Sequence, residues 1–173
     1  EGVSLDIAGF YNIYDNLRDT NAGAPTFDVV PFPRLTIPVR GNDDNAGESY
    51  GIEVAADWQV LPWWRLKGAY SLLDVDLEKN TRPDGGNSAR HQASLRSMMD
   101  LGGGWQFDLW PRYVDNLPSL GVESYFDLDA RLAWRPNETV EFAIVGQNLI
   151  DSRRKEFMPE SFPLSPTQVE RRA

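Results

Sequence analysis

The sequence predicts an all-β protein built from antiparallel, up-and-down strands. Three observations predict this fold class: apolar and polar residues alternate with a period of two, short and long connections alternate along the chain, and aromatic residues gather near the strand ends. No segment keeps the period of about 3.6 residues that an amphipathic helix requires. The expected architecture is therefore a sheet with one apolar and one polar face.

The period-two alternation defines seven candidate strands. In the first strand, for example, Leu5 and Ile7 alternate with Asp6 and Ala8. The seven strands are expected at residues 3–13, 34–58, 64–72, 92–101, 105–113, 126–134 and 140–147.

The second predicted strand is long and contains a polar run from Gly41 to Asn45. One interpretation is a single strand with a bulge at this run. The other is a pair of strands joined by a turn, which would place successive short connections at opposite ends of the sheet. Because that would break the alternation of connection lengths, we predict a single strand.

The connections divide into two classes by length. The short ones, at residues 60–63, 102–104 and 135–137, are rich in Gly, Pro and Asn, which favour tight turns. The long ones are expected at residues 16–33, 76–90, 115–124 and 151–167. Strict alternation of the two classes gives a sheet with short turns at one end and long loops at the other, which is typical of outer-membrane barrels. The sequence therefore predicts an antiparallel up-and-down transmembrane β-barrel segment.

Aromatic residues form two candidate belts on the apolar face. Five of the six Trp residues lie near the short connections, whereas several Tyr residues lie near the long ones. Amphipathic aromatic rings settle at the headgroup level of a membrane, so two belts that flank an apolar band predict a lipid-facing wall. The residues expected to form this lipid-facing girdle are Trp58, Trp64, Trp105, Trp134, Tyr70 and Tyr113.

Composition excludes several classes of protein. The chain has 173 residues and a net charge of -9, which opposes binding to nucleic acid because phosphate contacts need clustered Lys and Arg. It has no Cys, which excludes a disulfide, a thiolate metal site and a Cys nucleophile. Its longest charge-free stretches are nine residues, as from Phe142 to Ile150, which is too short for a membrane-spanning helix of about 20 residues. The first residue is Glu1 and no signal peptide follows, so we expect a mature piece or a fragment.

The polar face is the expected lumen wall of the barrel. Alternation of charge on it indicates cross-strand pairs, which stabilise neighbouring strands whether or not they contact a solute. The expected wall residues are Arg65, Lys67, Arg96, Asp108, Arg112, Asp129, Arg131 and Glu141.

A second cluster of charge, Arg153, Arg154 and Lys155, lies in the last long connection. Two functional interpretations are contact with lipid phosphates and contact with an anionic iron chelate, and the alternative is a solvated run of charge. No catalytic residue, metal site or cofactor is expected. His91 is the only His, and no nucleophile elbow or paired carboxylate site accompanies it.

Specific runs of the sequence resemble those of a known family. In family order, five runs resemble barrel strands of TonB-dependent outer-membrane receptors: residues 45–54 (NAGESYGIEV), 66–74 (LKGAYSLLD), 90–95 (RHQASL), 125–134 (YFDLDARLAW) and 146–151 (GQNLID). The resemblance covers nearly the whole chain, about residues 1 to 171.

The resemblance implies the C-terminal part of a barrel of 22 strands, in the cell outer membrane, that binds and imports a ferric siderophore or similar scarce nutrient. The family's plug domain has no counterpart in the chain, and its final strand, which closes with an aromatic residue, would only be starting near Glu170. Residues 1–173 are therefore expected to be barrel only, with seven strands and the start of an eighth. The implied partners are outer-membrane lipid, the remaining strands, the plug domain, a small-molecule iron chelate and, through the N-terminal region, the TonB complex. The resemblance implies a transporter and no enzyme.

Two other functional classes remain open from the residues alone. A small barrel closed by eight strands would serve as a structural or adhesive membrane protein. A soluble β-sandwich would bury the apolar face and use its Trp residues as a platform for sugars. Dependence on detergent separates the sandwich from both barrels.

Overall fold

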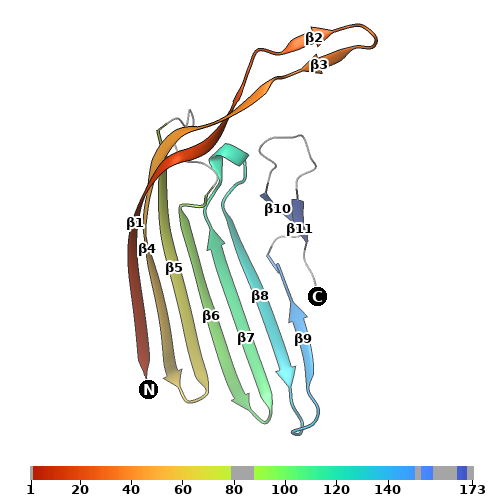
Figure 1. Ribbon diagram of the computed structural model, residues 1–173. Coiled ribbons are helices and arrows are strands. Elements are labelled where there is room, and N and C mark those ends of the chain that lie inside the picture. The colour runs from red at the N-terminus through yellow and green to blue at the C-terminus, as the bar shows by residue number, and fades with distance from the viewer. Residues whose placement is uncertain (1, 79–87, 151–152, 158–166, 171–173) are drawn as a thin grey trace.

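The computed structural model describes residues 2–78, 88–150, 153–157 and 167–170. Its main element is an open antiparallel sheet with the strand order β1-β4-β5-β6-β7-β8-β9 (Figure 1). The seven strands are β1 (Val3–Ala22), β4 (Val39–Leu61), β5 (Trp64–Leu77), β6 (His91–Gly102), β7 (Trp105–Val114), β8 (Tyr125–Trp134) and β9 (Phe142–Gly146). The predicted all-β, antiparallel, up-and-down arrangement of seven strands is confirmed.

The short connections lie at one end of the sheet and the long ones at the other (Figure 1). The turn between β6 and β7 is made of Gly102, Gly103 and Gly104, all with positive φ. A side chain on Gly104 would also collide with the carbonyl oxygen of Arg135, so both backbone conformation and space require glycine there. The third connection is longer than predicted, because Asn137 Oδ1 accepts hydrogen bonds from the backbone of Thr139 and Val140 and delays the start of β9. The described chain contains no helix of the length and apolar character that a membrane span would need.

The first long connection differs from the prediction. β1 does not end near Asn16 but continues to Ala22, paired with β4 across register shifts that start at Tyr14. The two strands thus form an arm that extends past the rest of the sheet and ends in the hairpin of β2 (Thr26–Asp28) and β3 (Arg34–Thr36) (Figure 1). Continuous pairing satisfies the backbone groups of a segment that would otherwise be a structureless loop of about 18 residues.

The polar run inside the second predicted strand is not a turn. β4 passes through Gly41–Asn45 without a break, and the register shifts opposite it, which confirms the prediction of one bulged strand. The start of that prediction is wrong. β3 is a separate strand that ends at Thr36, and Pro38, which has no backbone N–H to donate, lies between β3 and β4. The Pro38 carbonyl instead accepts a hydrogen bond from Gly23.

The last long connection also contains strands. β10 (Arg153–Phe157) and β11 (Thr167–Glu170) pair with each other in a separate two-stranded sheet. The expected start of an eighth strand therefore pairs with β10 and not with β9. Antiparallel segments that are close in sequence pair readily, because closing a short loop costs little entropy.

Cross-strand register gives the sheet two chemically different faces. Directly opposite residues share a face, so Ile7 joins Val54, and Trp105 joins Trp134, on the apolar face. Large apolar side chains on this face stay exposed, and the only buried apolar residues of the described chain are Ala89, Leu120, Val122 and Ala133. In the described residues no second sheet covers the apolar face, and β1 and β9 are not paired to each other. The described residues therefore form an open sheet, and neither a sandwich nor a closed barrel.

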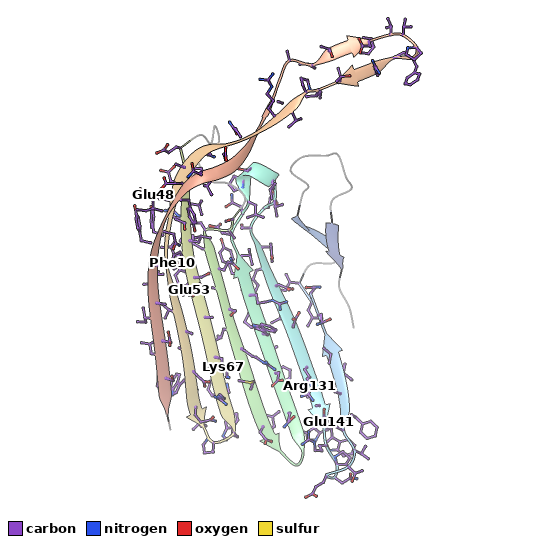
Figure 2. All side chains as sticks on the ribbon, viewed as in Figure 1. Phe10, Glu48, Glu53, Lys67, Arg131 and Glu141 are labelled. Carbon is purple, nitrogen blue, oxygen red and sulfur yellow. The ribbon has the colours of Figure 1, made fainter. Side chains whose placement is uncertain are left out.

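One glycine shows how closely the strands pack on the polar face. The ring of Phe10 lies over its cross-strand partner Gly51, where a Cβ would come within 2.6 Å of the Phe10 Cζ atom (Figure 2). Such a Cβ would also meet the Leu72 carbonyl oxygen. Gly51 is the second glycine of the run NAGESYGIEV, so that glycine has a packing explanation.

Candidate functional site

The polar face brings the predicted wall residues together. On β5 to β8, the predicted residues alternate in register, so that Lys67 lies opposite Arg96 and Asp108 lies opposite Arg131. Glu141 lies in the turn before β9, and its carboxylate contacts Arg131 (Figure 2). All eight residues named from the sequence therefore belong to one face.

Ion pairs cross several of the strand boundaries on this face. Asp57 on β4 accepts two hydrogen bonds from Arg65 on β5, from Nε at 2.7 Å and Nη2 at 2.6 Å, and Lys67 Nζ lies 3.3 Å from the same carboxylate. Arg96 on β6 lies 3.6 Å from Asp108 on β7. These cross-strand pairs fix the register of neighbouring strands and keep the face hydrated.

The pair between β7 and β8 is the most buried. Arg112 Nη2 lies 2.5 Å from Asp127 and 3.0 Å from Asp129. The Asp127 side chain is 0% exposed, and its other oxygen accepts the backbone N–H of Leu128 at 2.8 Å. Asp129 accepts the backbone N–H of Asn148 at 3.0 Å, which connects the segment after β9 to β8. Removal of Arg112 would leave a buried carboxylate without its cation.

The turn before β9 carries a further network. Glu141 contacts Arg131 and receives a hydrogen bond from Arg135 Nη2 at 2.6 Å. The hydrogen bond from Arg135 is the main cause that lowers the pKa of the Glu141 carboxyl, and the positive charge of Arg131 adds to it. The turn is therefore anchored to β8 by a carboxylate that stays ionised well below neutral pH.

Trp110 is a polar-face residue for which sequence reasoning predicted no role. Two guanidinium groups lie over its ring, with the Arg112 Cζ atom 4.6 Å and the Arg96 Cζ atom 5.8 Å from the ring centroid. Cation–π contacts of this length are attractive. The alternation along β7 could have revealed its position. Trp110 alternates with Leu109, which lies on the apolar face, and shares the polar face with Asp108 and Arg112.

The polar face is also the hollowed face of the sheet. A cavity of about 450 Å³ is bordered by Glu53 on β4, Ser71 on β5, Ser94 on β6, and Trp110 and Arg112 on β7. Figure 2 labels Glu53 on β4. A second cavity of about 180 Å³ is bordered by Trp110 as well, together with Arg96, Asp129 and Arg131. The face thus offers concave, charged and aromatic surface to whatever fills the space in front of it.

The predicted girdle residues lie on the opposite, apolar face. Trp105 and Trp134 are cross-strand partners with ring centroids 5.7 Å apart, and Phe142 extends this stack, 6.1 Å from Trp134. Trp58 and Trp64 lie at the same end on β4 and β5, and Trp64 Nε1 donates to Ser97 Oγ at 2.9 Å.

Tyr70 and Tyr113 form the other end of the apolar face. The Tyr70 hydroxyl lies 2.8 Å from His91 Nδ1, and the Tyr113 hydroxyl donates to Asp115 at 3.2 Å. Six positions separate Trp64 from Tyr70 on β5, and eight separate Trp105 from Tyr113 on β7, which is about 20 and 27 Å along the strands. These lengths suit the apolar band of a transmembrane barrel, about 25 Å tall.

Arg153, Arg154 and Lys155 are not in a loop, as the sequence predicted, but in β10, where their backbone pairs with β11. Their side chains lie outside the described part of the structure. Among the described residues, no group of three or more His, Cys, Asp or Glu is arranged to hold a metal ion. His91 stacks on Tyr70 at the apolar face, apart from the ion pairs of the polar face.

Comparison with known proteins gives two findings. The family model "TonB dependent receptor-like, beta-barrel" matches residues 1–149. Among solved structures, the ferric-catecholate import receptor Fiu from E. coli K12, in its closed form, is similar with a TM-score of 0.71 and 16% sequence identity. That match covers 98% of this chain and 24% of Fiu, so the chain spans about a quarter of the length of that receptor.

The two findings carry different weight. The likeness to Fiu, at 16% identity, shows the fold of the sheet. The family match covers most of the chain, and the family is one of transport receptors, typically found in the outer membrane, and not an enzyme class. Together with the open antiparallel sheet and its two faces, the match over residues 1–149 shows that this chain belongs to the TonB-dependent receptor family, as part of its β-barrel.

Proposed function

We propose that the chain is part of the wall of an outer-membrane active-transport receptor, which binds and imports a ferric siderophore or a similar scarce nutrient with energy relayed by TonB. The observation that carries the proposal is the two-faced sheet, in which an apolar band lies between two aromatic belts on one side and a polar, ion-paired surface covers the other side. Lipid on one side and a hydrated lumen on the other account for both surfaces.

In this proposal the apolar face contacts lipid. The girdle residues Trp58, Trp64, Trp105, Trp134, Tyr70 and Tyr113 lie at the two headgroup levels. The rim with short turns is periplasmic, and the rim with the β1–β4 arm and the other long connections is extracellular (Figure 1). Loops of that rim carry recognition because a rigid wall positions them while their sequences vary.

The polar face is proposed as the lumen wall, and other parts of the receptor complete the barrel. Residues 1–173 would then be the C-terminal portion of a 22-stranded barrel, with the remaining strands and the plug domain supplied from outside this chain, in line with the coverage of about a quarter of Fiu. Both free edges of the sheet, β1 and β9, need partners in a membrane, because an unpaired edge in lipid costs several kcal/mol per backbone group. The lumen of a 22-stranded barrel holds a plug, so the passage of a solute needs energy, which we propose is relayed by TonB.

Fiu is a ferric-catecholate import receptor, and this supports an iron chelate as the imported solute. Arg153, Arg154 and Lys155 on β10 are proposed to attract an anionic chelate or to contact lipid phosphates at the extracellular rim.

The test is uptake of radiolabelled ferric chelates by cells with and without the gene of the full-length receptor, each with TonB present or deleted. We expect uptake that needs both the receptor and TonB. Uptake that persists unchanged without TonB would reject an active receptor, and absence of uptake for every iron chelate would reject the iron substrate.

A further inference from the structure

Two basic side chains, Arg90 and His91, lie at the start of β6 on the apolar side of the sheet, just beyond its tyrosine residues. This is the end of the sheet that carries the long connections (Figure 1). His91 lies directly opposite Leu72 on β5. Arg90 Nη2 pairs with Asp74 Oδ2 at 2.7 Å, and Asp74 follows Leu72 on the same face of β5. In the proposed membrane position, both basic groups lie at the level of the lipid headgroups.

The row of residues next to these groups has a small side chain between two large ones. Tyr70 on β5 and Tyr113 on β7 are both cross-strand partners of Ala93 on β6. Neighbouring strands lie about 4.8 Å apart, so the two tyrosines start about 10 Å from each other with only a methyl group between them. The next residue of β6 on this face is Leu95, which is apolar and exposed. An acyl chain can therefore lie along β6 between the two rings, with its headgroup at His91.

The His91 ring is held in place by Tyr70. The two rings stack with their centroids 6.2 Å apart, and the Tyr70 hydroxyl oxygen lies 2.8 Å from His91 Nδ1. When the hydroxyl donates this hydrogen bond, the ring proton of a neutral imidazole is on Nε2. An Nε2–H group can donate to a phosphate oxygen. Tyr70 is therefore a positioning residue for His91.

Arg90 keeps donors available although it is paired. Its side chain is 63% exposed, and Asp74 contacts one end of a guanidinium that has five N–H donors in total. The planar fork of this group matches the oxygen atoms of a phosphate. Asp115, a second carboxylate at this end of the face, accepts hydrogen bonds from the Tyr113 hydroxyl at 3.2 Å and from the backbone N–H of Asn116 at 3.0 Å. Both bonds stabilise its charge without use of Arg90.

We propose that Arg90, His91 and the space over Ala93 form a binding site for a phosphorylated lipid of the outer leaflet. The phosphate pairs with Arg90 and accepts a hydrogen bond from His91 Nε2, and one acyl chain lies over Ala93 between Tyr70 and Tyr113. The inference rests on the proposed function, because it takes the apolar face to contact lipid. It goes further, because aromatic girdle residues do not select a headgroup, whereas a cation beside a hydrogen-bond donor selects a phosphate.

The test counts the lipid molecules bound to the purified full-length receptor in detergent by native mass spectrometry. Dipalmitoyl phosphatidate carries a phosphate and acyl chains, dipalmitoylglycerol carries the chains alone, and inorganic phosphate carries the charge alone. We expect phosphatidate to bind about tenfold more tightly than dipalmitoylglycerol, because its phosphate adds charged hydrogen bonds. An excess of inorganic phosphate should not displace it. Displacement would show an anion site that does not require a lipid and would overturn the proposal.

Variants of the ion pair distinguish a ligand contact from a structural contact. Arg90→Gln should weaken phosphatidate binding about tenfold, and Arg90→Lys, which keeps the charge without the planar fork, about threefold. Asp74→Asn breaks the same ion pair but leaves the cation, so binding should stay the same or become tighter. Arg34→Gln is the matched control. Arg34 also pairs with one carboxylate, that of Asp28, and is 56% exposed, but it lies on the β2–β3 hairpin, so its loss should not change binding.

Variants of the neighbouring residues locate the rest of the site. His91→Leu should weaken phosphatidate binding about fivefold, and Tyr70→Phe, which removes the hydroxyl that orients the imidazole, about twofold. Ala93→Phe fills the space between the two tyrosine rings and should weaken binding about fivefold. Ala56→Phe is the matched control, because it adds the same ring to the same face of the sheet, at a position opposite Gly68. This variant should bind phosphatidate as the unmodified receptor does.

Equal losses for Arg90→Gln and Asp74→Asn would mean that the ion pair only supports the fold, and would overturn the site. Equal losses for Ala93→Phe and Ala56→Phe would also overturn it. A receptor that imports a ferric chelate but binds phosphatidate and dipalmitoylglycerol equally would leave the proposed function standing and reject the site. Selective binding of phosphatidate by a receptor without uptake would reject the import function and keep the lipid site.

Discussion

The two faces of the sheet differ in whether they carry charged side chains. Between the aromatic belts, the apolar face carries side chains such as Leu95, Leu109 and Leu132 without a single Asp, Glu, Lys or Arg among the described residues. The polar face carries five cations on β5 to β8, and each of them lies close to a carboxylate. The stability of this wall therefore depends on where each charge is desolvated, and less on how much apolar surface is buried in a core.

The largest effect is expected where the polar face is least hydrated. Arg112→Met should destabilise the full-length receptor by about 3–5 kcal/mol, because Asp127 would remain buried without its cation. Arg65→Met is the matched control on the same face. Its partner Asp57 is partly exposed, so this change should cost much less. Urea unfolding in lipid vesicles measures both, and equal costs would contradict the role assigned to burial.

A charged side chain introduced on the apolar face should destabilise the receptor nearly as much. Leu95→Arg should destabilise the receptor by about 2–4 kcal/mol if this position of β6 faces lipid near the middle of the membrane. Met98→Arg on the same strand should cost clearly less, because Met98 lies on the polar face opposite Asp108. The same unfolding assay compares the two. A larger cost for Met98→Arg would mean that the faces are assigned the wrong way round.

A smaller, pH-dependent effect is expected at the turn before β9. The pKa of Glu141 is lowered in the folded chain, chiefly by the hydrogen bond from Arg135, so the ionised form stabilises the fold. This contribution is present above the ordinary pKa of 4.5 and is lost as the pH falls from there through the lowered folded value. Unfolding midpoints measured from pH 7 to pH 3 should therefore fall more steeply for the unmodified receptor than for Glu141→Gln. Parallel curves would show that the carboxylate does not anchor the turn.

The smallest effect is expected on β10. Replacement of Arg153, Arg154 and Lys155 by Gln should weaken binding of an anionic ferric chelate a few-fold at low salt and hardly at all at high salt, because screening removes long-range attraction. Arg153→Lys with Arg154→Lys keeps the charge and serves as control. Affinities of whole cells for the labelled chelate at two salt concentrations provide the measurement. A loss that is the same at both concentrations would point to a direct contact in place of steering.

Sequence reasoning succeeded where local alternation determines the structure. β6, β7 and β8 were predicted to within a residue or two, because apolar and polar residues alternate there without interruption and glycine turns bound the strands. It failed for the β1–β4 arm. The Pro-rich segment between Ala22 and Val39 shows no alternation of apolar and polar residues, whereas β1 and β4 stay paired along the arm because this pairing satisfies their backbone hydrogen-bonding groups.

The candidate site was predictable in its composition and not in its contacts. The alternation of polar and apolar residues along each strand assigned the wall residues Arg96, Arg112 and Asp129 to one face, since adjacent side chains of a strand point in opposite directions. The contacts of Trp110 with Arg96 and Arg112, and the burial of Asp127, depend on the register between three strands. Register is a tertiary property that a single sequence does not specify.

We expect the apolar face to contact lipid and the polar face to contact water. Nitroxide labels placed singly at consecutive positions from Ala93 to Leu101 on β6 of the full-length receptor in lipid vesicles test this assignment. We predict that labels at odd-numbered positions respond mainly to dissolved oxygen, which concentrates in lipid, and that labels at even-numbered positions, such as Arg96 and Met98, respond to a water-soluble nickel chelate or are shielded by protein. Accessibility that does not alternate along the strand, or that alternates with the opposite phase, would contradict the claim.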